Sequence, residues 1–169
     1  MGRVIPLDQL PPGTPVFVDA NIFIYHFIYE TVESPSCTTF LRRLEAGEYR
    51  GCTSPIVVSE VAHRLLVFAA IQRHHLEPKN AVRYLKEHPD HVKALGADLD
   101  AVSEIRNMGI AVLSVEPGDV FLSLTLQRQY GLMNNDSANL QVMLRNGIFS
   151  IASNDSDFDR IDAITVYKP

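Results

Sequence analysis

The sequence predicts an α/β fold in which helices cover both faces of a central parallel sheet. Two observations support this prediction. Short apolar segments alternate with longer segments of helical character, and many of the helical segments begin at a proline or end at a glycine, as helices commonly do. The 169 residues are 46% apolar, which is enough to build one domain around a sizeable core.

The order of these segments along the chain places each expected element. The expected strands are Val16–Val18, Arg50–Thr53, Ile110–Val115, Ile148–Ala152 and Ile164–Tyr167. The expected helices are Ala20–Tyr29, Ser34–Ala46, Ser54–His74, Pro78–His88, Pro89–Asn107, Pro117–Tyr130 and Asp136–Arg145. Residues 1–15 are rich in proline and glycine, so we expect a lead-in with little regular structure, ahead of a single domain over residues 16–169.

The charge of the chain argues against a protein that coats nucleic acid, because such proteins are strongly basic and this chain carries a net charge of −5. An enzyme that acts on nucleic acid is not excluded, because a site built from carboxylates is itself negative. The charge is unevenly spread, with nine Lys and Arg against six Asp and Glu in residues 42–93. This asymmetry would suit a phosphate-binding surface beside an acidic pocket, although solvated helix faces give the same pattern.

The cysteines and the apolar segments favour a cytoplasmic protein that does not associate with a membrane. Cys37 and Cys52 follow no metal or redox spacing, so we expect no disulfide framework, and a reducing compartment fits. The N-terminal segment has no long apolar stretch, so we expect no signal peptide. The longest apolar stretch, residues 56–71, contains Glu60 and Arg64, and is therefore expected to be a buried helix and not a membrane span.

Four acidic residues stand where an α/β fold usually carries its chemistry. Asp19 and Asp155 each follow an expected strand, and ligand crevices lie outside the carboxyl ends of parallel strands. Asp136 opens a helix, where the helix dipole favours a carboxylate, and Glu60 interrupts the apolar helix. Gathered carboxylates repel one another unless a cation lies among them, so the four together predict a site for a hard divalent metal.

Each of these acids also has an ordinary structural role. Asp19 could cap the helix that follows it, although Asn21 could do so equally well. Glu60 could form a surface ion pair with Arg64, four residues on, and Asp155 could belong to a polar turn. These roles suffice for each residue taken singly. Four independent roles would not, however, place four carboxylates at the same end of one sheet.

Further polar and aromatic residues could support such a site. Ser137 could add a hydroxyl group, and Asp157 is the second choice for a ligand in the last loop. Tyr25 and Phe27 could stack on a base, although core packing is the more common role of such residues. The candidate phosphate contacts are the basic residues Arg42, Arg43, Arg64, Arg73 and Lys79, although exposed basic residues are common.

In this order and setting the acidic motifs resemble those of the PIN-domain family. Four segments carry the resemblance. The family's opening strand and first acid are matched by VFVDANIFIYHF, and the helix that carries its Glu by SPIVVSEVAHRL. Its third-acid helix is matched by NNDSANL, and its last site loop by FSIASNDSDFDRI. The resemblance extends over residues 16–167 and is greatest to the VapC-type toxins of prokaryotic toxin–antitoxin pairs. The positions that match the family's site are the acids Asp19, Glu60, Asp136 and Asp155 and the polar residues Asn21 and Ser153.

The resemblance implies a three-layer α/β/α fold, a Mg²⁺ or Mn²⁺ cofactor and endoribonuclease activity whose products carry a 5′-phosphate and a 3′-hydroxyl. It also implies an antitoxin protein as partner and a homodimer. Two features differ from the smaller toxins, namely an enlarged helical region over residues 74–108 and the additional lead-in. The third-acid helix reads Asp136-Ser137-Ala138, where many members read Asp-Ala.

The expected chemistry is metal-assisted hydrolysis of a phosphodiester bond. A bound metal would contact a phosphate oxygen and lower the pKa of a water molecule, which then attacks phosphorus in line. Asp19 and Asp136 are the expected direct ligands, while Glu60 and Asp155 would bind through water or orient the nucleophile. The expected substrate is single-stranded or looped RNA, because a paired A-form helix hides its bases.

Other functions fit the sequence less well. A non-catalytic PIN-like module that binds metal or RNA would not need intact acids, and a stand-alone RNA-processing nuclease without an antitoxin remains open. A haloacid-type phosphatase needs a second Asp two residues after the first, where this chain has Asn21. Neither G-x-G-x-x-G nor G-x-x-x-x-G-K-[ST] occurs, which disfavours a dinucleotide-binding dehydrogenase and a P-loop enzyme. A flap-type DNA nuclease would usually be longer.

Overall fold

The computed structural model describes residues 2–28, 31–96 and 100–169. Within these ranges six parallel strands form one sheet in the order β1-β6-β5-β2-β3-β4. The strands are β1 (Arg3–Pro6), β2 (Pro15–Val18), β3 (Arg50–Thr53), β4 (Ala111–Val112), β5 (Ser150–Ala152) and β6 (Thr165–Lys168). The parallel sheet at the centre of the predicted fold is therefore confirmed.

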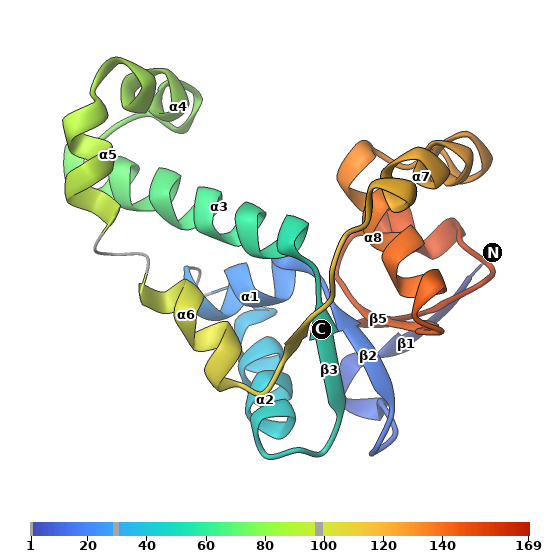
Figure 1. Cartoon of the computed structure of the whole chain (residues 1–169). Coiled ribbons are helices and arrows are strands. Elements are labelled where there is room, and N and C mark those ends of the chain that lie inside the picture. The colour runs from blue at the N-terminus through green and yellow to red at the C-terminus, as the bar shows by residue number, and fades with distance from the viewer. Residues whose placement is uncertain (1, 29–30, 97–99) are drawn as a thin grey trace.

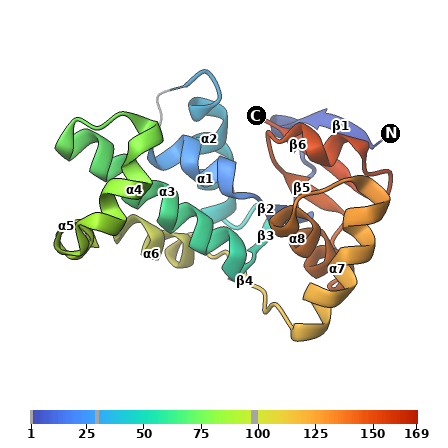
Figure 2. The same cartoon turned by 90° about the horizontal axis from the view of Figure 1, so that it is seen from above.

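Helices lie on both sides of this sheet, which confirms the three-layer α/β/α arrangement. One side carries α1 (Ala20–Phe27), α2 (Ser34–Glu45), α3 (Pro55–His74) and α6 (Asp100–Asn107), and the other carries α7 (Pro117–Tyr130) and α8 (Asn134–Arg145), as Figures 1 and 2 show. Two further helices, α4 (Pro78–Glu87) and α5 (Pro89–Leu95), lie at the far end of α3 (Figure 1). Short 3-10 helices follow β1 and β5, namely η1 (Leu7–Gln9) and η3 (Ser156–Arg160).

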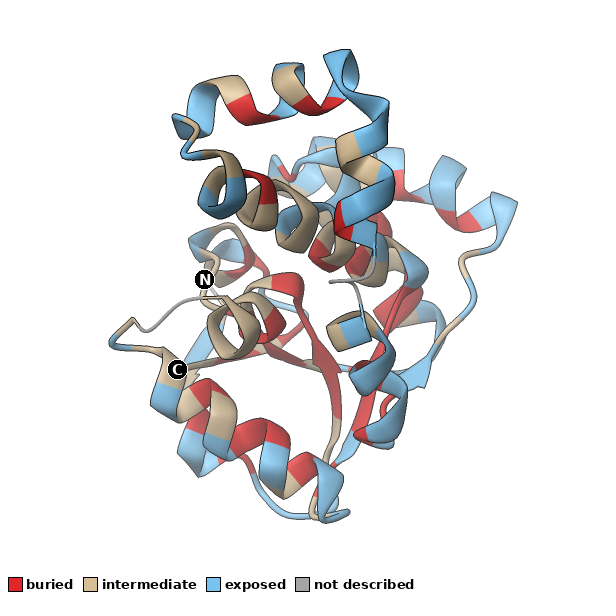
Figure 3. Cartoon of the chain, turned by 90° about the vertical axis from the view of Figure 1, so that its left-hand side faces the viewer, coloured by how far each residue is buried: buried red, intermediate tan, exposed pale blue. Residues whose placement is uncertain are grey.

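The core lies where these layers meet. Val16, Phe17 and Val18 of the central strand β2 are fully buried, because helices cover both faces of the sheet at that point. Figure 3 shows buried residues along the strands and on the helix faces that pack towards the interior, whereas the outer faces of the helices are exposed. The continuous apolar run before Asp19 therefore marks a central strand.

The N-terminal segment differs from the prediction. Arg3–Pro6 forms the edge strand β1, which pairs with β6 from Arg3 opposite Thr165 onward. Leu7 and Leu10 are each only 2% exposed and belong to the main core. The expectation of little regular structure in residues 1–15 was wrong, because prolines are tolerated at the end of an edge strand and two leucines anchor the segment.

Three predicted elements differ in extent from the prediction. The single helix expected over Pro89–Asn107 is divided into α5 and α6, and Gly96, a residue of low helix propensity, lies directly after α5. The strand expected over Ile110–Val115 is reduced to β4, an edge strand that pairs with β3 through two residues. Helix α1 ends at Phe27, and Tyr29, its expected last residue, lies outside the described residues.

Helix α3 is less buried than its composition suggested. Of its 20 residues only Val57, Val61 and Ala70 are fully buried, which corrects the expectation of a buried helix. Its length and its mean hydropathy of 1.4 would suffice to cross a membrane, and 17% of that apolar window is buried. Composition alone is weak support for a membrane span, and in this structure α3 packs against α1, α4, α5 and α8.

The far end of α3 carries the enlarged helical region. There α3, α4 and α5 share a small core of Ala70, Leu85 and Leu95, separate from the core under the sheet. This distal lobe, as we call the C-terminal half of α3 with α4 and α5, projects away from the sheet in Figure 1.

Candidate active site

The four predicted acids meet in one cavity. The side chains that line this cavity of about 320 Å³ include Asp19, Glu60, Asp136 and Asp155, together with Asn21, Tyr25 and Arg64. They come from four separate segments: the end of β2, the middle of α3, the start of α8 and the loop after β5. Strands β2 and β5 are parallel neighbours, so the residues that follow their carboxyl ends lie side by side. We call this cavity the acid cavity.

Asp19 combines a structural role with a place in the acid cavity. Its Oδ1 accepts a hydrogen bond of 2.8 Å from the Ala20 N–H and so caps α1. Its Oδ2 accepts hydrogen bonds of 2.6 Å from the Ser153 hydroxyl and 2.6 Å from the Asn21 amide. Of the two caps that the sequence left open, Asp19 is therefore the one that forms, and Asn21 helps to orient its carboxylate.

The environment of Asp19 disfavours its charge. The residue is 7% exposed, and burial, followed by the charges of Glu60 and Asp155, raises its pKa to about 6. The hydrogen bonds from Ser153 and Ala20 lower the pKa and partly offset this increase. Three carboxylates thus act on one another electrostatically in a place that water reaches poorly.

Asp136 lies in the first turn of α8 and is affected more strongly. Burial raises its pKa to about 7, and the charges of Asp19, Asp155, Glu60 and Asp157 raise it in the same direction. The N-cap position of α8 is occupied by Met133, without a side-chain hydrogen bond, so neither Asp136 nor the two asparagines before it cap the helix. Its carboxylate is therefore free to face the cavity.

The loop after β5 brings in the last acid and its alternative. The Asp155 carboxylate caps η3 by accepting a hydrogen bond of 2.8 Å from the Asp157 N–H, and fully buried Phe158 anchors the turn. Asp157 forms an ion pair with Arg160. One carboxylate oxygen each of Asp136, Asp155 and Asp157 lies within 4.8 Å of the other two.

The supporting hydroxyls differ in their placement. Ser153 is fully buried, donates to Asp19 and accepts a hydrogen bond of 3.0 Å from the Asp155 N–H, so it connects two of the acids. Ser137 is buried too, but its hydroxyl donates to the Asn134 carbonyl at 3.0 Å and does not line the acid cavity. The structure therefore brings Ser153 to the site and turns Ser137 away from it.

A buried hydrogen bond positions the two helices that carry Glu60 and Asp136. Ser54 caps α3 and donates to Oδ1 of Asn139 on α8 at 2.6 Å. Asn139 is 1% exposed. Asn139 was not among the residues predicted for the site, although it lies three residues after Asp136 among apolar neighbours, and such a polar residue on a buried helix face needs a specific partner.

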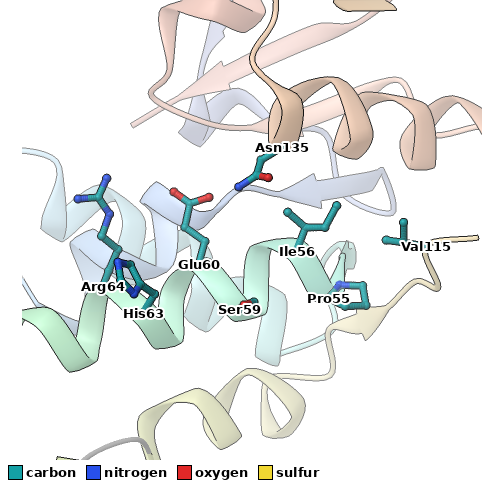
Figure 4. A pocket seen from close by; sticks show the side chains of 8 residues that line it. All are labelled: Pro55, Ile56, Ser59, Glu60, His63, Arg64, Val115 and Asn135. Carbon is teal, nitrogen blue, oxygen red and sulfur yellow. The ribbon is translucent and has the colours of Figure 1, made fainter. Parts of the chain in front are cut away.

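The acid cavity adjoins a larger hollow between α3 and the start of α8. Glu60 and Arg64 line both, and the hollow, of about 810 Å³, is also bordered by His63, Asn135 and Val115. Figure 4 shows the Glu60 carboxylate directed towards Asn135 across the gap, with the Arg64 guanidinium on the same side of α3. No ion pair joins Glu60 to Arg64 in the part of the chain that the structure describes, so the surface pair considered as the ordinary role of Glu60 is not formed.

The candidate phosphate contacts are dispersed. Arg64 lines the acid cavity, and Arg42 lines a separate groove between α1 and α2. Arg43 is engaged in a bidentate ion pair with Glu48, with an Nε–Oε2 distance of 2.8 Å. Lys79 on α4 pairs with Glu77, and Arg73 lies near the end of α3, so both belong to the distal lobe.

The donor set fits a hard divalent cation. All the candidate ligand atoms are carboxylate oxygens, which Mg²⁺ and Mn²⁺ prefer over nitrogen or sulfur. The raised pKa values of Asp19 and Asp136 reflect mutual repulsion as well as burial, and a cation among the oxygens would relieve that repulsion.

Comparison with known proteins agrees with this geometry. Residues 16–164 match the sequence model of the PIN domain family. The chain is 30% identical over 153 residues to Ribonuclease VapC2 of Methanocaldococcus jannaschii. The aligned region covers 90% of this chain and 93% of that protein.

Solved structures of low sequence identity share the fold. The chain resembles VapBC2 of Rickettsia felis, which was solved bound to a DNA fragment from its promoter. The TM-score is 0.57 at 15% sequence identity, and the match covers 92% of this chain and 98% of that one. It also resembles VapC20 of Mycobacterium tuberculosis, described as a sarcin–ricin loop cleaving toxin, with a TM-score of 0.51, 18% identity and coverage of 85% and 92%.

Proposed function

Because the chain belongs to the PIN domain family, we propose that it is a divalent-metal-dependent endoribonuclease and the toxin of a toxin–antitoxin pair. One observation carries the proposal: four carboxylates from distant segments line a single cavity at the carboxyl ends of β2 and β5. The similarity to Ribonuclease VapC2 over nearly the whole of both chains supports RNA as the substrate.

The residues of the acid cavity have different roles in the proposed reaction. Asp19, Asp136 and Asp155 would hold Mg²⁺ or Mn²⁺, and Asp157 supplies a further oxygen close to the last two. The bound ion would polarise the phosphate and acidify a water molecule. Glu60, on the opposite helix, would accept a hydrogen bond from the attacking water and so orient it, while Ser153 and Asn21 hold Asp19 in place.

Arg64 is the proposed phosphate contact at the site. Its side chain lines both the acid cavity and the larger hollow, and it forms no ion pair among the described residues. A guanidinium there would bind a phosphate oxygen of single-stranded or looped RNA that enters along α3. It would also offset part of the negative charge of the acids, which otherwise repels the substrate.

Two protein partners belong to the proposal. An antitoxin is supported by the toxin–antitoxin proteins that share the fold, VapBC2 of Rickettsia felis among them. A homodimer is supported by α7, which leaves Val120, Phe121 and Leu124 exposed on one side. The exposed fraction of Phe121 is 73%, which is unusual for a phenylalanine that contacts only water.

A cleavage assay tests the proposal. Purified protein would be incubated with single-stranded, looped and fully paired RNA in Mg²⁺, in Mn²⁺ or in EDTA, with Asp19→Asn as the inactive control. We expect metal-dependent cleavage inside the unpaired RNA and products with a 5′-phosphate. Metal binding without cleavage of any RNA would instead show a non-catalytic binding module. Full activity of Asp19→Asn would remove this carboxylate from the mechanism.

A further inference from the structure

We propose that the groove between α1 and α2 binds the nucleotide adjacent to the scissile phosphate. The proposal rests on the ribonuclease function proposed above and assigns a second subsite to it. This groove, of about 670 Å³, is lined by residues that include Tyr25, Phe27, Thr38, Thr39 and Arg42. We call it the α1–α2 groove.

The α1–α2 groove and the acid cavity meet at one side chain. Tyr25 lines both of them, so its phenol forms the boundary between the carboxylates and the groove. An RNA strand whose phosphate lies among the acids would reach the groove within one nucleotide, because the two spaces share a wall. The larger hollow between α3 and α8 also adjoins the acid cavity, through Glu60 and Arg64, but unlike the groove it has a carboxylate in its wall.

The Tyr25 hydroxyl is held by the catalytic loop. The Asn154 side-chain amide donates a hydrogen bond of 3.0 Å to the Tyr25 oxygen, and the Asn154 N–H donates one of 3.0 Å to Oδ1 of Asn21. The Tyr25 oxygen acts as acceptor in this bond, so its own O–H remains available to donate towards a phosphate or a base. Asn154 lies between Ser153 and Asp155, so the loop that supplies the acids also orients the tyrosine.

The chemistry of the groove matches a nucleotide. The side chains that line it within the described ranges include no carboxylate, in contrast to the acid cavity. Arg42 is exposed and has no ion-pair partner among the residues described, whereas the next residue, Arg43, is bound to Glu48. Arg42 can therefore bind a phosphate, and the aromatic rings of Tyr25 and Phe27 offer surfaces for a base.

The neighbouring histidine does not add charge to the groove. Burial lowers the pKa of His26, and the charge of Arg42 lowers it further, although Glu104 acts in the opposite direction. Nδ1 of His26 lies 2.9 Å from the Thr38 hydroxyl, and its ring contacts Phe27 at 4.9 Å between centroids. His26 therefore fixes the wall of the groove, and Arg42 is left as the cation that faces it.

The test compares Arg42→Ala and Tyr25→Phe with Arg83→Ala, which removes an exposed arginine of α4 and leaves both cavities intact. Steady-state cleavage of a short single-stranded RNA would be measured for each variant at several salt concentrations. We expect Arg42→Ala to raise KM about three- to tenfold and to reduce the slope of log KM against log salt by about 0.7, as loss of one phosphate contact does. Tyr25→Phe should lower kcat with little change in that slope.

The possible outcomes separate the two proposals. If the wild-type protein cleaves no RNA, the ribonuclease function fails and the subsite with it. If the wild type cleaves RNA and both groove variants behave like Arg83→Ala, only the subsite is refuted. If the groove variants cleave RNA normally but bind the antitoxin more weakly, the groove binds protein and the proposal is also refuted. Equal melting temperatures would show that the variants are folded.

Discussion

At the scale of single residues, the acids of the site differ in how they are held. Both oxygens of Asp19 accept hydrogen bonds, so its position is fixed before any ligand binds. The Asp136 carboxylate has no hydrogen-bond donor among the described residues, and its pKa is the more strongly raised of the two. In the proposed metal site Asp19 would thus be a preorganised ligand, and Asp136 would gain most from a bound cation.

We predict that Asp136→Asn stabilises the metal-free protein at pH 8. The folded-state pKa of about 7 lies above the ordinary value of 3.8, so Asp136 ionises more readily in the unfolded chain than in the folded one. The free energy of unfolding is therefore highest below pH 3.8, where both states are protonated, and it decreases as the pH rises through 7. The amide removes that loss, and because Asp136 is only half-buried the gain should be about 1–2 kcal/mol. Urea unfolding in EDTA at pH 5 and pH 8 measures it.

The same measurement with saturating Mg²⁺ is the control. We expect the wild type to become the more stable protein, since it alone binds the ion fully. If Asp136→Asn is less stable than the wild type in EDTA at pH 8, the mutual repulsion of the carboxylates, on which the proposed metal site depends, is contradicted. Asp19→Asn is a poorer probe of stability, because its amide would lie against the Asn21 amide that now donates to the carboxylate.

We predict that Ser153→Ala shifts the pH dependence of cleavage upwards. The Ser153 hydroxyl lowers the pKa of Asp19 from the higher value that burial alone would impose, so its removal should raise that pKa above 6. Cleavage should then be weak at pH 6.5 and recover towards pH 8.5. A pH–rate profile checks this, and an equal loss of activity at every pH would indicate a structural role instead.

At the scale of elements, the sequence predicted best what depends on local chemistry. Proline starts gave the first residues of α2, α3 and α7 to within one residue, and glycine ends gave the last residues of α2 and α7 equally well, because caps are local. Strand β1 was missed because its pairing with β6 joins residues at opposite ends of the chain. The break between α5 and α6 was missed because a lone glycine is a weak signal.

The same distinction applies to the site. Asp19, Asp136 and Asp155 could be found because they follow strands or begin a helix, and Glu60 because it interrupts an apolar helix. The topology of the parallel sheet then brings the ends of the strands together. Asn139 and Asn154 could not be placed, since each acts through one partner that is distant in sequence, Ser54 and Tyr25 respectively. A single sequence does not specify which of many asparagines finds such a partner.

We predict that acid loosens the distal lobe before the rest of the molecule. The His74 and His91 rings stack at 4.4 Å between centroids, and Tyr84 contacts the imidazole of His91 at 2.8 Å. Burial, and then the charges of His91, Arg73 and His88, lowers the pKa of His74 below its ordinary 6.5. Stability from the neutral stack is therefore present above pH 6.5 and is lost as the pH falls below it.

Hydrogen exchange followed by mass spectrometry at pH 7.5 and pH 5.5 tests this prediction. After correction for intrinsic rates, protection in α4 and α5 should decrease at the lower pH while protection in β2 and β5 is retained. His74→Gln, which cannot gain the charge, should show a smaller difference between the two conditions. An equal loss of protection in the sheet and in the distal lobe would mean that the histidines do not cause the acid sensitivity of the lobe.

At the scale of the whole molecule, the outer surface of α7 carries exposed apolar side chains. Helix α7 packs on α8 through a polar contact, in which buried Asp119 accepts a hydrogen bond of 2.9 Å from Arg145. Its apolar side chains Val120, Phe121 and Leu124 therefore face outwards. Leu126 and Tyr130 of α7 pack against the core, so these outward apolar residues are additional to its inward face and suit the proposed contact with a second copy.

We predict that Phe121→Asp converts a dimer into a monomer, because it places a charge at the centre of that exposed apolar surface. The dissociation constant should rise at least about tenfold, as for loss of a central aromatic contact. Phe149→Asp is the matched control, since Phe149 is also exposed, at 56%, but lies outside α7. Light scattering over a concentration series measures both variants. A wild type that stays monomeric at high concentration, or a Phe149→Asp variant that alone dissociates, would show that α7 is not the contact between two copies.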